Sequence, residues 1–109
     1  MKIDNINNYV RGWIFGMFEP SLLKTEEFEF SIKKYKTGDF ELKHHHKIAT
    51  EYTIIISGKV KFNGVEYGPD DIVIIEPNES TDFLCVEDAV SAVIKYPGAQ
   101  NDKYIDKKS

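Results

Sequence analysis

Three consecutive histidines, His44 to His46, stand shortly before an acidic residue, Glu51, and they are the only histidines of the chain. Two imidazoles and one carboxylate form a ligand set that suits iron, manganese, nickel, copper or zinc, with positions left for water or substrate. Calcium is a poor candidate because it prefers shells made of oxygen atoms alone. The secondary structure must therefore direct these side chains to one point.

Apolar and polar residues alternate along most of the chain, which predicts β-strands. Between positions 39 and 46 one face would carry Phe40, Leu42, His44 and His46, and the other Asp39, Glu41, Lys43 and His45. We expect the two imidazoles of the first set to face inward and His45 to face solvent. A turn after His46 can return Glu51 to the space that these imidazoles face.

Further alternating runs, separated by turn residues, follow this segment. Asn63-Gly64 lies between alternating flanks and predicts a hairpin with a type I′ turn. Other turns are expected at 67–71, 77–80 and 87–89, the last of them between two separate strands. With no convincing helical period, the pattern predicts an all-β domain, a sandwich or a small barrel.

The spacing from Gly38 to Gly58 resembles the first conserved motif of the cupin superfamily. Five residues separate Gly38 from His44, one separates the two histidines, four precede Glu51 and six precede Gly58. The resemblance covers roughly residues 28–96 and implies an antiparallel double-stranded β-helix, or jelly-roll, barrel with the site in its mouth. It also implies that His44, His46 and Glu51 are metal ligands.

The second cupin motif usually supplies a fourth ligand, a histidine, and this chain departs from that pattern. Thr81 stands at the position of the histidine, where a hydroxyl would at most orient a metal-bound water. Glu76 or Glu79 could reach the metal instead. Tyr52 could supply a further hydroxyl near the site. Three phenylalanines, otherwise core residues, are candidates for the apolar floor of a pocket: Phe40, Phe62 and Phe83.

The chain is expected to have three parts. Residues 1–27 form an N-terminal arm, residues 28–96 the barrel, and residues 97–109 a polar tail that lies along the surface or frays. The run VRGWIFGMF at 10–18 is apolar for a segment outside a barrel. It predicts a homodimer in which the arm pairs with, or packs on, a second copy.

Composition excludes several classes of protein. The 109 residues allow one domain, and a formal net charge of -4 with scattered basic residues argues against nucleic-acid binding. No apolar run approaches the roughly 20 residues of a transmembrane helix, and the N-terminus lacks the features of a signal peptide. We expect a cytoplasmic protein, with Cys85, the single cysteine, buried as a small apolar residue.

Three functions remain open on this sequence, so it does not decide whether the protein is an enzyme. A metal-dependent enzyme could act on a small organic acid or a sugar-like substrate. A metal-free site could use His44 or His46 as a general base oriented by Glu51, as in the isomerisation of a sugar nucleotide. A module that binds a small ligand without turnover would have the same pocket.

Overall fold

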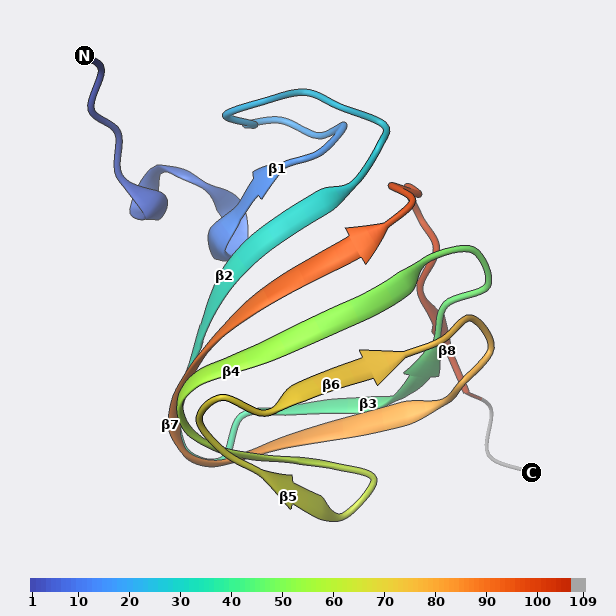
Figure 1. The fold of residues 1–109 in the computed structure, drawn as a ribbon. Helices are drawn as coiled ribbons and strands as arrows, with labels where there is room; N and C mark the ends of the chain where they lie inside the picture. The colour runs from blue at the N-terminus through green and yellow to red at the C-terminus, as the bar shows by residue number, and fades with distance from the viewer. Residues whose placement is uncertain (107–109) are drawn as a thin grey trace.

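Eight β-strands and two short 3-10 turns make up residues 1–106, the part of the chain that the computed structural model describes (Figure 1). The 3-10 turns are η1 (Ile6–Asn8) and η2 (Val10–Gly12). The strands are β1 (Trp13–Phe15), β2 (Glu29–Tyr35), β3 (Phe40–His45), β4 (Thr50–Phe62), β5 (Val65–Tyr67), β6 (Ile72–Ile75), β7 (Thr81–Tyr96) and β8 (Tyr104–Ile105). No helix within these residues has the length and apolar character needed to cross a membrane.

Two long strands, β4 and β7, are shared by both halves of the barrel. In one half, β2 pairs with the end of β7, the start of β4 pairs with β7 and β6, and β1 lies outside β2. In the other half, β3 pairs with the start of β7, β5 pairs with the end of β4, and β8 lies outside β3. Every strand pair is antiparallel. The predicted jelly-roll barrel is confirmed.

The shared strands pass between the halves by bending, not by breaking. Figure 1 shows β4 and β7 curving at the left edge of the barrel and continuing into the other half. The pairing of the two strands shifts register several times between Ile55 and Val60, and Gly58 has a φ of 84° at this bend. Such bulges turn a strand while its ladder continues. The expected turn at 87–89 was therefore wrong, because these residues lie within β7.

The predicted hairpin is present at Asn63 and Gly64. Phe62 pairs with Val65, so the loop has two residues, and both have positive φ, 51° and 78°. Positive φ at both central positions defines the type I′ turn, whose twist matches that of the flanking strands. The local sequence was sufficient here because the turn depends on these two residues alone.

The core fills one end of the barrel. Its buried members come from both bent strands and their neighbours: Ile55, Val60, Phe62, Ile75, Phe83, Cys85 and Ala89. Toward the other end, the inward positions of β7 continue with Ser91, Val93 and Lys95, so the interior becomes polar. Burying polar groups without partners is costly. The polar side chains at this end of the barrel therefore need hydrogen-bond partners or a ligand.

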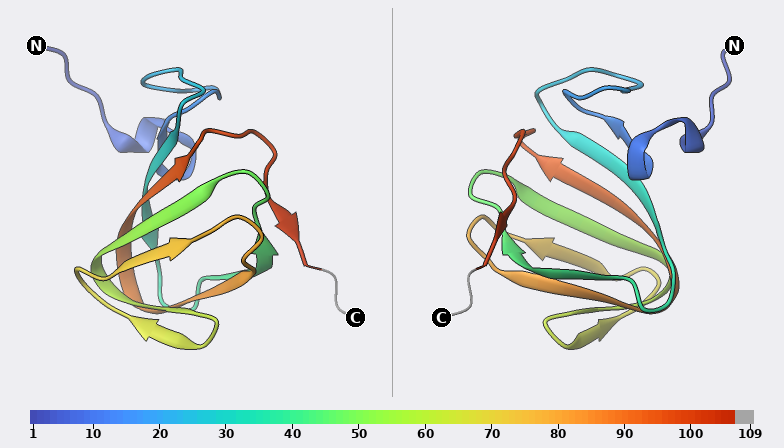
Figure 2. Two further views of the ribbon diagram at one scale, coloured as in Figure 1. Left: turned by 45° about the vertical axis from the view of Figure 1, so that its right-hand side comes forward. Right: turned by 180° about the vertical axis from the view of Figure 1, so that it is seen from behind.

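The C-terminal segment and residues 10–15 pack on the barrel, whereas the first five residues of the chain are exposed. Figure 2 shows the N-terminal segment beside β2 and the C-terminal segment against the β3 side. The arm pairs with its own chain, since Trp13 lies opposite Ser31. Of the two alternatives for the tail, the described residues lie along the surface and do not fray, because Asp102 is only 5% exposed and β8 extends the sheet. Positions 107–109 of the expected tail lie outside the described residues.

Replacing Gly58 with alanine tests the bend in β4. A Cβ at Gly58 would lie 2.1 Å from the carbonyl oxygen of Asp88, whereas a Cβ at Gly64 would meet nothing within 4 Å. Both residues have positive φ, so alanine at either position has a conformational cost of about 1 kcal/mol. Gly64→Ala carries this cost alone, because its Cβ would meet no other atom. We expect Gly58→Ala to lower the free energy of unfolding by more than about 2 kcal/mol. Equal losses in urea denaturation would show that the bend tolerates a side chain.

Candidate functional site

A pocket of about 370 Å³ opens at the polar end of the barrel. Its walls come from three parts of the chain. The barrel contributes the inner faces of β2, β3, β4 and β7, the N-terminal arm contributes residues around Trp13, and the C-terminal segment contributes Lys103. A volume of this size suits a small organic molecule. His44, His46 and Glu51, the three predicted metal ligands, all line it.

A bulge in β3 determines which of its side chains enter the pocket. Glu41 pairs with Phe83 and His44 pairs with Thr81. The two pairs are therefore three positions apart along β3 but only two positions apart along β7. The extra residue reverses the alternation between Glu41 and His44. The predicted alternation was therefore wrong at the start of the strand: Glu41 lines the pocket, whereas Phe40 and Leu42 are 69% and 62% exposed.

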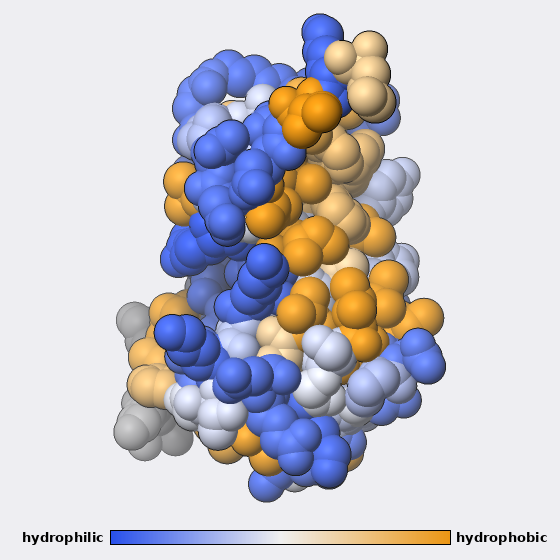
Figure 3. Space-filling model, turned by 90° about the vertical axis from the view of Figure 1, so that its left-hand side faces the viewer, coloured by the Kyte–Doolittle hydropathy of each residue, from blue (hydrophilic) through white to orange (hydrophobic). Residues whose placement is uncertain are grey.

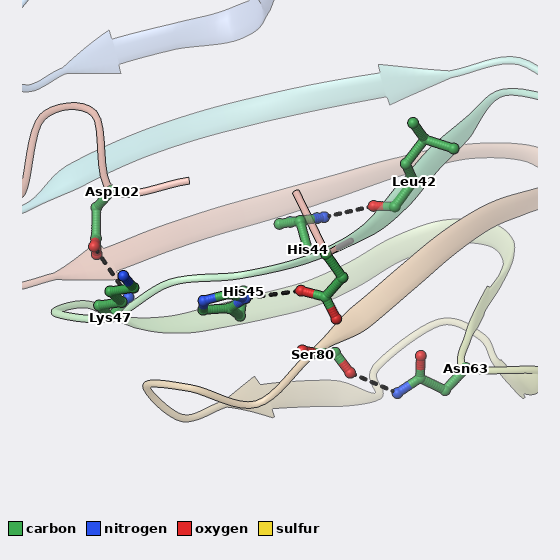
Figure 4. Close-up of polar contacts among 8 residues, drawn as sticks. Leu42, His44, His45, Lys47, Asn63, Ser80 and Asp102 are labelled. Carbon is green, nitrogen blue, oxygen red and sulfur yellow. Dashed lines mark hydrogen bonds and ion pairs between the residues drawn. The ribbon is translucent and has the colours of Figure 1, made fainter. Parts of the chain in front are cut away.

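His44 and His46 are buried, at 7% and 3% exposed. The Nδ1 of His44 lies 2.9 Å from the carbonyl oxygen of Leu42, which can only accept a hydrogen bond (Figure 4). Nδ1 therefore carries the proton, and in the neutral ring Nε2 keeps its lone pair. Fixing the tautomer in this way is what a backbone partner does for a metal-binding histidine.

His46 has a buried ring nitrogen without a partner. Its Nε2 makes no hydrogen bond to any described residue. Burial lowers the pKa of His46 to about 4, and the charges of Lys95 and His44 act in the same direction. The ring is therefore neutral at pH 7. A buried polar atom left unpaired costs about 1–3 kcal/mol, so this nitrogen is a site where a ligand gains free energy.

The two imidazoles fit a shared ion. A ligating nitrogen lies about 2.1 Å from its metal, which places the ion about 3.2 Å from the ring centre, so two rings sharing an ion have centroids within about 6.5 Å. The centroids of His44 and His46 are 5.4 Å apart. The two rings are inclined by 81°. Their separation is therefore compatible with joint ligation.

Glu51 does not join the imidazoles as the side chains stand. One of its carboxylate oxygens accepts a hydrogen bond of 3.4 Å from the hydroxyl of Thr53. In the sheet it lies opposite Lys95, which in turn lies opposite Glu29. Within residues 1–106, no group of three or more His, Cys, Asp or Glu side chains is arranged to hold a metal ion. Ligation by Glu51 requires at least another rotamer of its side chain.

Strand geometry places some of the other predicted site residues at the pocket and the others outside it. Thr81 is buried and lies directly across from His44, while Phe62 and Phe83 line the pocket. Tyr52 lies between two inward residues of β4, so it faces outward, and it was wrongly expected near the metal. Phe40 was wrongly expected in the pocket for the same reason, since the bulge leaves it on the outer face. Glu76 and Glu79 are exposed.

Several groups in the pocket were not predicted from the sequence. Glu41 accepts a 3.2 Å hydrogen bond from Lys103. Burial would raise the pKa of Glu41, but Lys33 and Lys103 outweigh that effect and hold it below its ordinary value. Trp13 reaches the pocket from β1. No usable signal for any of them was present in the sequence: the alternation of β2 predicts an apolar face with Ile32 and a polar face with Lys33, and it is the polar face that lines the pocket.

Asp102 holds the loop that joins the two histidines to Glu51. Its carboxylate accepts hydrogen bonds from the backbone N–H groups of Lys47, Ile48 and Ala49, at 3.0 to 3.3 Å. Figure 4 shows the bond from Lys47. Burial would raise the pKa of Asp102, but the hydrogen bonds from Ala49, Lys47 and Ile48 outweigh it, and the pKa lies below its ordinary value. The carboxylate therefore fixes the backbone directly after His46.

A second set of contacts from the same segment fixes β3. The ring of His45 stacks on Tyr104, with centroids 5.5 Å apart, and its Nδ1 lies 2.8 Å from the carboxylate of Asp106. The ammonium of Lys47 lies 4.2 Å from the centre of the Tyr104 ring. His45, expected to face solvent, is thus half-buried under the C-terminal segment. Tyr104 and Asp106 therefore hold β3 from its outer side, opposite the side that carries His44.

Comparison with solved structures identifies the fold. No family model and no curated protein match the chain. A protein from Klebsiella pneumoniae described as uncharacterised, with a double-stranded β-helix domain, has a TM-score of 0.71 at 19% identity, over 98% of this chain and 93% of that one. A cupin-2 domain protein from Shewanella frigidimarina has a TM-score of 0.56 at 14% identity, over 69% and 76% of the two chains. The chain has the cupin fold.

A functionally described protein shares this cupin fold. The DMSP lyase DddQ from Ruegeria pomeroyi has a TM-score of 0.70 at 14% identity, over 85% of this chain and 49% of the lyase. The chain thus spans about half the length of that enzyme. At these identities the similarity establishes the cupin fold alone, and it agrees with the resemblance of residues 38–58 to the first cupin motif.

Replacing Asp102 with asparagine tests the clamp on the loop after His46. The amide keeps one acceptor oxygen and turns an NH₂ group toward backbone donors, so we expect a loss of about 1–3 kcal/mol in unfolding free energy. We also expect the imidazole NMR signals of His46 to shift. Asp88→Asn is the matched control, because Asp88 accepts from the backbone and hydroxyl of Thr37, away from the pocket. Unchanged His46 signals in Asp102→Asn would contradict a positioning role.

Proposed function

We propose that the chain binds a divalent transition metal through His44, His46 and Glu51, together with a small polar organic molecule in the same pocket. The observation that carries the proposal is the unpartnered Nε2 of His46, buried beside an imidazole whose own Nε2 keeps its lone pair. A metal would satisfy both nitrogens at once. Glu51 lines the same pocket and supplies the charge that two neutral imidazoles lack.

The donor set suits iron, manganese, nickel, copper or zinc. Such an ion, held by three protein ligands, polarises a carbonyl or activates oxygen at its exchangeable positions. The chain's own residues orient what binds there. Leu42 fixes the tautomer of His44, Asp102 fixes the loop after His46, and Thr81 pairs with His44 across the strands.

A metal-free site is the second candidate, and the environment of Glu51 favours it. Glu51 lies opposite Lys95, so an ammonium group already provides a positive charge near the carboxylate. In this alternative, neutral His46 acts as a general base next to a substrate carbonyl. The fold is compatible with a metal site and with a metal-free site. It is also compatible with a protein that binds a small ligand without turnover.

Metal analysis and calorimetry separate the two candidates. We expect untagged protein, purified without chelators, to contain up to one equivalent of a transition metal. We expect the apoprotein to bind Mn²⁺, Ni²⁺ or Zn²⁺ with an affinity that His46→Ala lowers by more than roughly tenfold. Glu66→Ala is the control, because Glu66 is exposed on β5, outside the pocket. If His44→Ala and His46→Ala both bound metal as wild type does, the ligand assignment would be wrong.

The outer face of the sheet supports the proposed homodimer. Two rows of apolar side chains cross β2, β7, β4 and β6 on the side opposite the pocket: Phe30, Ile94, Tyr52 and Ile74 in one row, and Ile32, Ala92, Ile54 and Ile72 in the next. Ile72 and Ile74 are 58% and 52% exposed. Figure 3 shows a band of apolar side chains along one side of the molecule. Exposed apolar patches of this kind mark interaction sites.

We propose that this outer face, and not the N-terminal arm, binds a second copy of the chain. The two rows carry no charge, so identical faces related by a two-fold axis pack without like-charge contacts. Sheets also pack face to face through such side chains. The arm is less available, because Trp13 and its neighbours pair with β2 and line the pocket of their own chain.

Light scattering tests the homodimer. We expect the mass of a dimer at roughly 50 µM and the mass of a monomer for Ile74→Lys, since an uncompensated charge at an apolar interface costs several kcal/mol. Val65→Lys is the matched control, because Val65 is equally exposed, at 54%, but lies on β5, outside the two rows. A monomeric mass for the wild type would exclude the dimer.

A cytoplasmic location is part of the same proposal. Cys85 is a free thiol, 1% exposed, and burial raises its pKa. A thiol in this environment packs as a small apolar side chain and reacts slowly. A reducing compartment suits a chain that relies on no disulfide among its described residues.

A further inference from the structure

The indole ring of Trp13 is contacted by two lysines from the barrel wall. The ammonium of Lys33, on β2, lies 4.9 Å from the ring centre, and the ammonium of Lys95, on β7, lies 5.1 Å from it. Trp13 itself comes from β1, so three strands meet at this point. All three side chains line the pocket that contains the histidines. The feature therefore belongs to the pocket but lies outside the predicted ligand set.

The cations of this region are not neutralised by direct ion pairs. Of the other charged side chains that line the pocket, Glu41 pairs with Lys103 and Glu19 pairs with Lys24. Within residues 1–106, neither Lys33, Lys95 nor Arg11 forms an ion pair. Lys95 lies across the strands from Glu29 and Glu51, yet it contacts neither carboxylate directly.

Burial increases the need of these cations for an anion. Desolvation lowers the pKa of Lys33; Glu41 opposes this effect, while Lys95 and Arg11 add to it. Desolvation also raises the pKa of Glu29, although the charge of Lys95 acts the other way. Two ammonium groups that both lie about 5 Å from one indole repel each other, so the charge of Lys95 adds to desolvation in lowering the pKa of Lys33. An oxyanion placed between them would relieve this repulsion.

We propose that this region binds the carboxylate of a small organic acid between the ammonium groups of Lys33 and Lys95, with the apolar part of the acid against Trp13. The inference deepens the proposed function and rests on it, because it names the chemical class of the organic molecule. Charge-assisted hydrogen bonds hold a carboxylate more strongly than neutral ones do. The volume of about 370 Å³ limits the acid to a small one.

The composition of the walls explains why an acid with an apolar part fits this region. Val10, Trp13 and Phe18 line the pocket from the N-terminal arm, and the rings of Trp13 and Phe18 meet edge to face at 6.4 Å. Trp13 also contacts both lysines, so the apolar and the charged parts of the wall adjoin each other. A molecule with one charged end and one apolar end meets complementary groups at both ends, whereas inorganic phosphate would meet only the lysines.

Trp13 provides the readout for a direct test, since it is the only tryptophan of the chain. Its fluorescence is followed while metal-free protein is titrated with cyclohexanecarboxylate and, separately, with cyclohexanecarboxamide. The two probes have nearly the same shape and differ in charge. We expect the carboxylate to bind at least roughly tenfold more tightly than the amide, as a fully desolvated charge pair requires.

Variants assign the binding to the two lysines. Lys33→Gln and Lys95→Gln should each weaken carboxylate binding roughly tenfold and leave amide binding unchanged. Lys34→Gln is the matched control, because Lys34 is exposed on the opposite face of β2 and should bind as wild type does. Lys33→Arg should retain most of the affinity. The emission maximum of each free variant shows whether Trp13 keeps its place.

The outcomes separate this inference from the metal proposal. Equal binding of the two probes, or no change in fluorescence with carboxylate up to about 10 mM, would overturn the inference, because a specific site binds more tightly than that. Unchanged carboxylate affinity in both glutamine variants would overturn it as well. Metal affinity is measured on the same variants by calorimetry. If Lys33→Gln binds metal but not carboxylate, the organic-acid site and the metal site are supported independently.

Discussion

The barrel buries a neutral imidazole nitrogen without a hydrogen-bond partner, and the rest of the site follows from that constraint. His46 is 3% exposed, and its Nε2 contacts no polar group of the described chain. Stability alone does not favour such an arrangement, because an apolar side chain of similar volume would avoid the cost of desolvation. The polar end of the barrel therefore lowers stability, while the apolar core at the other end supplies the compensating burial.

Two contacts that are distant in sequence keep this arrangement in place. Asp102 holds the backbone between His46 and Glu51, and β8 pairs with β3 at His44 and His45. The strand and the loop that carry the proposed ligands are thus both fixed by the C-terminal segment. The N-terminal arm covers another side of the same pocket through Trp13. A barrel of this size depends on both terminal segments to enclose its site.

The sequence predicted the features that depend on local chemistry. The Asn63-Gly64 turn, the antiparallel barrel and the spacing from Gly38 to Gly58 could all be read from short stretches. It failed where the outcome depends on a partner strand. The bulge that brings Glu41 inward and leaves Phe40 outside arises from the register of β3 against β7, which no alternation within β3 reveals. The bends of β4 and β7 and the clamp by Asp102 are likewise contacts between distant segments. The expected turn at 87–89 was therefore wrong, and the sequence left open whether the tail lies along the surface or frays.

The charges of the pocket link the two proposed ligands. Lys95 and a divalent ion would both be partners for Glu51, and with both present the ion and the ammonium would repel each other at short range. A carboxylate between Lys33 and Lys95 would reduce that repulsion by neutralising the ammonium groups. The organic acid would therefore strengthen metal binding, and by thermodynamic linkage the metal would strengthen binding of the acid by the same factor. The hydrogen bond from Thr53 and the charge of Lys95 on the neighbouring strand give a physical reason why the Glu51 carboxylate does not join the two imidazoles in the described structure.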